Sequence, residues 1–451
     1  MKSRKMRRVT ARYTWDRLKV SFWFAPTIMA VIAILLSWLM LWLDGQIPNE
    51  NLENSRLVLS GSADEMRGYL FNMATTVLAT AGIVFTLLTL PLSTVAAQYG
   101  SRLLRVFLGD RVTQLVLGMF VATFVYCIAS ATSIPPAEIN PESAQITVTF
   151  GLILMMGTFA SLIVLVQHIS TMLQAPNIAA AAGAELLNVI LAEAPFEVSE
   201  ASNALNQSGQ GMVDTSVDQD GFAIRVWTTG YIQYIDAEYV LALLGEKDLL
   251  LRLLCKPGDF IFQGEVIAMV SPAARVDEQV EKQIRRAFQI ARRRTPTQDV
   301  EYAFNQLVEM AVRAMSPAIN DPFTAMTCLE YIGNGLTLFV QKGERCPVVY
   351  DQNGKPRFIF EPMTIDKLLN SSFNMLRHCS CDNATVLQSM LKVIDVVGRE
   401  TKSLEIRQKL AYHVNLIQLE SKAGSLVEPD KHLIQLNGDA LQVKLKTAFE
   451  Q

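Results

Sequence analysis

The chain has 451 residues, of which 50% are hydrophobic and 18% are charged, and its formal net charge is −3. This length is enough for two or more domains, and the charged fraction is low against the ~25% of ordinary soluble domains. The charge balance excludes a generally basic chain that coats nucleic acid, so no nucleic-acid partner is expected. Six cysteines in so long a chain do not form a disulfide framework, and we expect them to be reduced.

Apolar residues are concentrated before residue 170, where four segments approach the ~20 residues that cross a bilayer. The predicted spans cover about 22–43, 69–97, 112–133 and 144–166. They form a transmembrane domain at 22–168 behind a basic tail at 1–21. The first span is a poor signal peptide, because it is long and ends in Trp-Leu-Asp-Gly rather than at a small-residue cleavage site.

The placement of lysine and arginine predicts the orientation of the spans. The tail carries eight of these residues and the loop after the second span carries three. The loop after the first span has two arginines against five acidic residues, and the loop after the third span has none. By the positive-inside rule, both termini of this multi-pass protein are expected on the cytoplasmic side of a bacterial inner membrane.

The second span carries small and polar residues along one side, at steps of three and four. The members of this stripe are Asn72, Thr75, Gly82, Thr86, Thr89 and Ser93. Two interpretations stay open: close helix packing through small residues, or the lining of a polar pathway at a symmetry axis. No acidic or basic residue lies at the centre of any span, which argues against a proton-coupled transporter.

The membrane-proximal segments suggest contacts with lipid and with other subunits. The stretch 98–111 is amphipathic, so Arg102 and Arg105 are expected to face lipid headgroups. His168, at the membrane boundary, is either a pH-sensing or ion-binding residue or a simple interfacial anchor. The alanine- and glycine-rich helix expected at 169–196 favours contact between subunits, and therefore a homo-oligomer.

Alternating residues predict a small β-module at 197–274, after a polar loop. Its Lys256-Pro-Gly-Asp turn resembles a corner of lipoyl-like barrel-sandwich modules. No hairpin lysine flanked by small residues or methionine is present, so no covalent cofactor is expected. The cluster His378-Cys379-Ser380-Cys381 lacks a second cysteine pair, so no metal site is expected. No catalytic motif is legible, and the chain is not expected to be an enzyme.

The remainder, 275–451, is predicted to be mainly helical, with a short hairpin near 348–360. A basic helix is expected at 282–294. Its Arg292, Arg293 and Arg294 form either a lipid or anion contact or an ordinary solvated face.

Two helices are predicted to meet at the segment Met315-Ser-Pro-Ala-Ile-Asn-Asp-Pro-Phe-Thr-Ala-Met326. Ser316 and Pro317 end the first helix, and Asn320 or Asp321 caps the second, with Pro322 in its first turn. This segment is either a structural corner or a site in which Ser316, Asn320, Asp321 and Thr324 hold an ion, a phosphate or a partner's backbone.

Four stretches stand out together: Gly109–Gly118, Lys256–Phe260, Gln298-Asp299 and Arg313–Ala325. In these stretches the chain resembles the bacterial DUF2254 family of predicted membrane proteins. The last stretch usually reads Ala-Leu-Ser-Pro-Gly-Ile-Asn-Asp-Pro-x-Thr-Ala in the family, whereas this chain has Met315 and Ala318 in place of the leucine and glycine. The resemblance covers roughly residues 15 to 425 and implies an architecture but no biochemistry.

We therefore expect an α-helical integral membrane domain of four spans, followed by a cytoplasmic α+β region made of a small β-module and a helical domain. The favoured function is an oligomeric channel or pore-like conduit with a regulatory cytoplasmic domain. The alternative is a membrane-anchored scaffold or sensor that binds a cytoplasmic protein partner or lipid headgroups.

Overall fold

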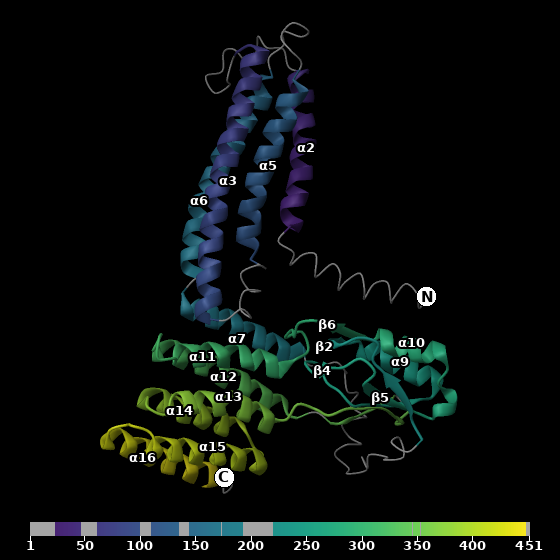
Figure 1. Ribbon diagram of the computed structural model, residues 1–451, viewed down its shortest axis with the longest axis vertical. Coiled ribbons are helices and arrows are strands. Elements are labelled where there is room, and N and C mark those ends of the chain that lie inside the picture. Colours follow the sequence, from purple (N-terminus) through teal and green to yellow (C-terminus); the bar gives the residue numbers. More distant parts are fainter. Residues whose placement is uncertain are drawn as a thin grey trace. The chain divides into compact units, whose positions relative to one another are not determined.

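The computed structural model describes residues 23–46, 61–99, 110–134, 144–172, 174–192, 220–344, 346–351 and 353–447. The chain divides into two compact units, Met1–Ile178 and Ala179–Gln451. Figure 1 shows the elements of each unit, coloured along the sequence. The units are described separately below.

The first unit is a bundle of long helices that lie side by side (Figure 1). They are α2 (Phe24–Asp44), α3 (Ala63–Tyr99), α5 (Arg111–Ser133) and α6 (Gln145–Met172). With α7 (Ala175–Ala192), five of the described helices are long and apolar enough to cross a membrane. The helices α2, α3, α5 and α6 match the four predicted spans, and α7 is a fifth that the sequence prediction did not count.

Helix α5 packs against α2, α3 and α6 and supplies much of the buried surface. Hydroxyl groups join the helices: Tyr126 Oη donates to the Thr147 carbonyl at 2.9 Å, and Ser130 Oγ donates to Ser37 Oγ at 2.9 Å. At the end of α2, the Asp44 carboxylate accepts hydrogen bonds from the first backbone N–H groups of α6, Ile146 and Thr147. Inside a bilayer, burial of apolar surface does not favour helix association, so such hydrogen bonds and close packing hold the helices together.

The helical part of the second unit forms successive layers below α7: α11 with α12, α13 with α14, and α15 with α16 (Figure 1). These helices are α11 (Val300–Ala314), α12 (Pro322–Lys342), α13 (Ile365–Cys379), α14 (Ala384–Glu400), α15 (Leu404–Ala423) and α16 (Glu428–Thr447). Five of them begin at a side chain that accepts a hydrogen bond from the first turn, which satisfies an otherwise unpaired N–H. The five capping residues are Asp299, Asp321, Thr364, Asn383 and Ser403.

The β-region of the second unit contains two sheets. The five-stranded sheet has the order β1-β5-β3-β8-β7 and the three-stranded sheet has the order β4-β2-β6. The strands are β1 (Phe222–Arg225), β2 (Gly230–Ile235), β3 (Leu250–Leu253), β4 (Phe260–Ile261), β5 (Val266–Ser271), β6 (Phe288–Ala291), β7 (Val348–Tyr350) and β8 (Pro356–Ile359). Three short helical segments complete it: α9 (Ala237–Lys247), η3 (Ala273–Arg275) and α10 (Glu278–Arg286).

The β-region differs from the prediction at one place and agrees with it at another. The basic helix expected at 282–294 is wrong beyond Arg286, because α10 ends there and β6 follows. Phe288 and Ile290 pack into the β-region core as a strand, paired with Ile235 and Ile232 of β2. The predicted hairpin near 348–360 is present as β7 and β8, and β8 pairs in parallel with β3. This pairing places Phe358 in the same core.

Candidate functional site

Helix α3 has one face that is used inside the first unit and one that is not. Its buried residues include Met66, Leu70, Met73, Val77 and Val84. On the other side the predicted stripe, together with Ala79, is exposed along its whole length: Asn72, Thr75, Ala79, Gly82, Thr86, Thr89 and Ser93. Its steps alternate between three and four residues, the 3.5-residue period of a left-handed helix–helix seam. The stripe therefore takes no part in packing among the described residues of the first unit.

Two further observations describe the chemistry of this stripe. The hydroxyls of Thr75 and Thr86 donate to carbonyls of their own helix, those of Phe71 at 2.9 Å and Gly82 at 3.1 Å. A Cβ added at Gly82 would meet no described atom within 4 Å, whereas one at Gly151 would lie 3.2 Å from Leu70. An exposed helical glycine costs up to about 1 kcal/mol relative to alanine. The described part of the first unit thus gives no packing reason for the glycine at position 82.

Asp110 and His168 form a polar contact near one end of α5 and α6. The Asp110 carboxylate caps α5 by accepting from the Thr113 N–H and hydroxyl, and it lies 3.0 Å from His168 Nε2. Burial alone would raise the pKa of Asp110, but the hydrogen bonds from Thr113 and His168 outweigh it and lower that pKa below its ordinary value. The histidine singled out from the sequence thus has a partner, Asp110, which lies 58 residues away along the chain.

The corner segment, which we define as Ser316–Thr324, is closed by its own backbone and by a helix cap. The Ser316 carbonyl accepts from the Asn320 N–H at 2.8 Å, and the Asp321 N–H donates to the Ala314 carbonyl at 2.8 Å. Asp321 caps α12, accepting from the Thr324 N–H at 3.1 Å and hydroxyl at 2.5 Å. The residue with positive φ is Asn320, at 46°, a residue type that tolerates this region, so Ala318 does not need a glycine's freedom.

A second candidate site forms where the Lys256-Pro-Gly-Asp turn meets the start of α11. Arg294 binds the buried Asp299 with two hydrogen bonds, Nε to Oδ2 at 2.5 Å and Nη2 to Oδ1 at 3.0 Å. Gly258, with φ of +96°, lies against this ion pair, and a Cβ there would overlap the Asp299 carboxylate. Gln298 completes the junction by bonding both the N–H and the carbonyl of Ile235. The Lys256-Pro-Gly-Asp turn, Arg294 and the pair Gln298-Asp299 thus meet at one place.

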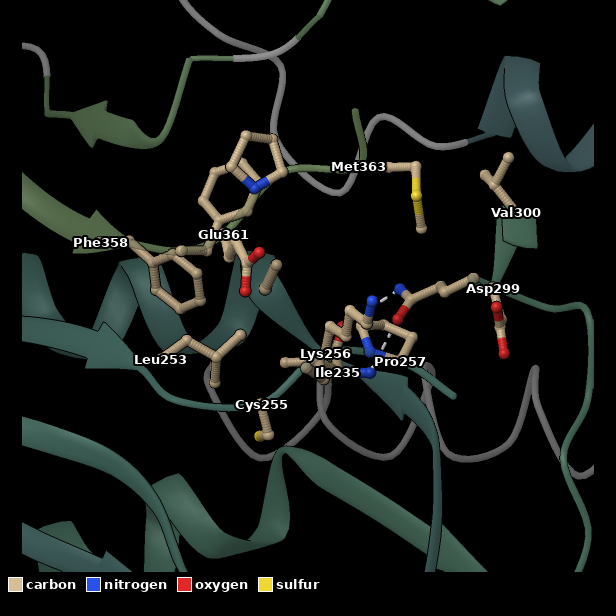
Figure 2. Close-up of a pocket in the computed structure, with 14 residues that line it drawn as sticks. Ile235, Leu253, Cys255, Lys256, Pro257, Asp299, Val300, Phe358, Glu361 and Met363 are labelled. Atoms are coloured by element: carbon tan, nitrogen blue, oxygen red, sulfur yellow. Dashed lines mark hydrogen bonds between the residues drawn. The ribbon is translucent and has the colours of Figure 1, made fainter. Parts of the chain in front are cut away.

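This junction encloses a narrow cavity of about 80 Å³, which shares part of its lining with a neighbouring cleft of about 440 Å³. Figure 2 shows its lining side chains, which include Leu253, Cys255, Lys256, Phe358, Glu361 and Met363. Burial raises the pKa of the Cys255 thiol, and its Sγ lies 3.4 Å from the Ile267 carbonyl oxygen, so this cysteine is protonated and unreactive at neutral pH. A mostly apolar cavity lined also by Lys256, Asp299 and Glu361 suits a small ligand better than nucleophilic chemistry.

The predicted arginine contacts divide into three cases. Arg102 and Arg105 lie outside the described residues. Arg292 and Arg293 are exposed, whereas Arg294 is occupied by Asp299. Among the described residues, no group of three or more histidine, cysteine, aspartate or glutamate side chains has an arrangement that could hold a metal ion.

The long apolar helices of the first unit define a multi-pass membrane protein. The family model of predicted membrane proteins named DUF2254 matches residues 19–395, and the chain belongs to this family. Similar chains include an uncharacterised protein of Mycobacterium bovis and one of Mycobacterium tuberculosis. Each is 25% identical over 379 residues, covering 81% of this chain and 70% of the relative. No solved structure matches the chain.

Proposed function

We propose that the chain is an oligomeric channel or pore-like conduit of a bacterial inner membrane, with both termini and the second unit in the cytoplasm. The helices α2, α3, α5 and α6 are its four spans. We place α7 outside the membrane, because Gly183 and Leu186 lie against Tyr331 and Gly335 of α12. In addition, Lys342 Nζ donates to the Ile190 carbonyl at 2.6 Å, which fixes the end of α7 to the end of α12.

The observation that carries this proposal is the exposed seam on α3. Seven small or polar residues at alternating steps of three and four form a surface that another helix can approach closely. The open space at Gly82 is explained by such a neighbour from a second copy. The hydroxyls of Thr75 and Thr86 already donate to carbonyls of α3, so they need no hydrogen bond from water. When several copies are arranged around an axis, their seams place methyl groups, hydroxyls and the Asn72 amide toward that axis.

The same helix offers a matched pair of variants that tests the seam. Thr75 and Thr76 are both exposed, and each hydroxyl donates to the carbonyl four residues before it, at 2.9 Å and 2.8 Å. Only Thr75 lies on the seam. We expect Thr75→Leu to change the number of subunits in lipid nanodiscs and to reduce ion flux in proteoliposomes, whereas Thr76→Leu leaves both unchanged.

Separate outcomes overturn the two parts of the proposal. A wild-type chain that has a single copy per nanodisc, or equal effects of the two leucine variants, refutes the seam as a subunit interface. A stable oligomer with no flux for any monovalent ion refutes the conduit and favours the alternative function, a membrane-anchored scaffold or sensor.

The second candidate function is a membrane-anchored scaffold or sensor. It is favoured by the cavity at Lys256 and Glu361 and by the exposed Arg292 and Arg293, which suit a small ligand and anionic headgroups or an acidic protein partner. Its test is binding of the full-length protein to cytoplasmic extract and to anionic vesicles. If Arg292→Gln and Arg293→Gln leave binding unchanged, these arginines are not part of the interface.

A further inference from the structure

Helix α16 is apolar on two opposite sides, and only one of them is packed inside the second unit. The helix belongs to the last layer of the helical part, where it packs on α14 and α15 (Figure 1). On its inner side Ile434, Leu441 and Leu445 are buried. A helix that is apolar on both sides is normally covered on both. Its other side, which we call the outer face of α16, carries four exposed residues: Leu433, Leu436, Ala440 and Val443.

The outer face has the spacing of a helix–helix contact. Its residues follow one another at steps of three, four and three, the period of the a and d positions of a left-handed pair of helices. Leu433 and Ala440 take position a. Leu436 and Val443, which are 55% and 58% exposed, take position d. The small side chain at position 440 lets a second helix come close, so the face suits a helix of the same shape.

Charged residues flank the outer face on both sides. Asp439 takes heptad position g and Lys444 takes position e. The exposed Asp439 carboxylate accepts a hydrogen bond from Gln418 Nε2 at 2.9 Å, which holds it beside the outer face. The Lys444 side chain is 64% exposed, and its contact with Asp395 is long, at 3.7 Å. Both charges are therefore within reach of a helix placed on the outer face.

These charges are complementary to those of a second α16 that runs in the same direction. In a parallel pair, position g of one helix contacts position e of the following heptad of the other. Asp439 of each copy then meets Lys444 of the other copy. An antiparallel pair would bring Asp430 to Lys444, which is also attractive, but it would set the two copies of Asp439 against each other at its centre. Like charges in opposition select against that arrangement.

We propose that the outer face of α16 is a contact between copies of this chain, in which two α16 helices pack in parallel and in register. The occupant is a second copy because the face matches itself in both spacing and charge. Every copy is anchored in the same membrane by its first unit, so a short contact forms at the high local concentration of a bilayer. The contact uses residues of the second unit alone and is separate from the seam on α3.

The test detects cross-links between copies of the full-length protein in proteoliposomes. The photoreactive amino acid benzoylphenylalanine replaces Asn437, which is exposed beside the outer face. This light chain is mixed with a heavy-isotope chain before reconstitution, and mass spectrometry identifies peptides that join the two. We expect links from position 437 to α16 of the heavy chain. The control position, Lys282 on α10, has a side chain that is 60% exposed and is expected to give none.

Reversal of the charges tests the parallel arrangement. Asp439→Lys and Lys444→Glu each place like charges opposite each other across the contact, so we expect each variant to lower the cross-link yield several-fold. The double variant restores opposite charges in a parallel pair and is expected to restore the yield. A folding defect in one variant would not be repaired by the other change, so recovery in the double variant separates the contact from folding.

Three results overturn the proposal. If position 437 gives no link between light and heavy chains, the outer face does not meet a second copy. If its links lead to a segment other than α16, the outer face contacts a different part of that copy. A double variant with a yield as low as the single variants excludes the parallel arrangement. The cross-link without ion flux refutes the proposed conduit alone, whereas ion flux without the cross-link refutes the α16 contact alone.

Discussion

Protonation of His413 is expected to weaken the helical part of the second unit at mildly acidic pH. This histidine lies on α15, is 1% exposed, and packs against the rings of Phe373 and Tyr412, each with ring centroids 5.7 Å away. Its buried Nδ1 has no hydrogen-bond partner among the described residues. Burial, and after it the positive charge of Arg377, lower the pKa of His413 to about 4, against a smaller opposing effect of Asp366.

The sign and size of the effect follow from linkage. The unfolded chain binds a proton below the ordinary pKa of 6.5, whereas the folded chain does not bind it until the pH approaches about 4. Stability is therefore full above pH 6.5, falls as the pH drops below it, and stops falling near the folded pKa. Between pH 7.5 and 5 the loss is about 2 kcal/mol, or roughly a 30-fold rise in the opening equilibrium.

Hydrogen exchange of peptides from α13 and α15, corrected for the intrinsic pH dependence of exchange, measures this opening. In the variant His413→Leu, which keeps an apolar side chain of similar size, we expect protection to be nearly the same at pH 7.5 and pH 5. Peptides from α10, which lies in the β-region core, serve as the internal control. Equal acid sensitivity in the wild type and in His413→Leu would show that another group is responsible.

Three further variants test particular contacts. Asp321→Ala removes the cap of α12 and is expected to lower local stability by about 1 kcal/mol, measured by hydrogen exchange of the first turns of α12, with α14 as reference. Asp299→Asn removes the buried carboxylate that Arg294 binds and leaves it the longer contact to Glu301 at 3.4 Å; it is expected to cost about 3 kcal/mol, seen as faster proteolysis between β6 and α11, and an unchanged rate would mean that the ion pair with Asp299 adds nothing. Gly183→Leu forces a side chain into the Tyr331 ring and is expected to release α7 from α12, seen as faster exchange in both helices.

The membrane helices were predictable because length and apolar content decide whether a segment can cross a bilayer. The fifth candidate helix, α7, also passes the length and hydropathy criteria, although the proposed topology does not count it as a span. Its Leu186 is buried, against Gly335 of α12. Apolar content alone does not separate a span from a helix buried by protein, because both environments reward the same residues.

The stretch 287–294 was mispredicted for a related reason. Its arginines fit a basic helix, whereas the structure depends on Phe288 and Ile290, which pair with β2 and fill the β-region core. The partner strand lies more than fifty residues earlier, so no local pattern reveals it. The cap of α12 was predictable as Asn320 or Asp321, because a cap depends on residues within one turn, and the structure has Asp321 there.

Contacts at Asp299 join short motifs that lie far apart in the sequence, the turn at Gly258 and the pair Gln298-Asp299. Gly258 has to lack a side chain because the Asp299 carboxylate occupies that space, and Asp299 is held there because it both caps α11 and binds Arg294. Each of the three residues is thus constrained by the other two, although 41 positions along the chain separate Gly258 from Asp299. The same helix α11 ends at the corner segment. One helix of 15 residues, α11, therefore connects the cavity beside Lys256 with the corner segment.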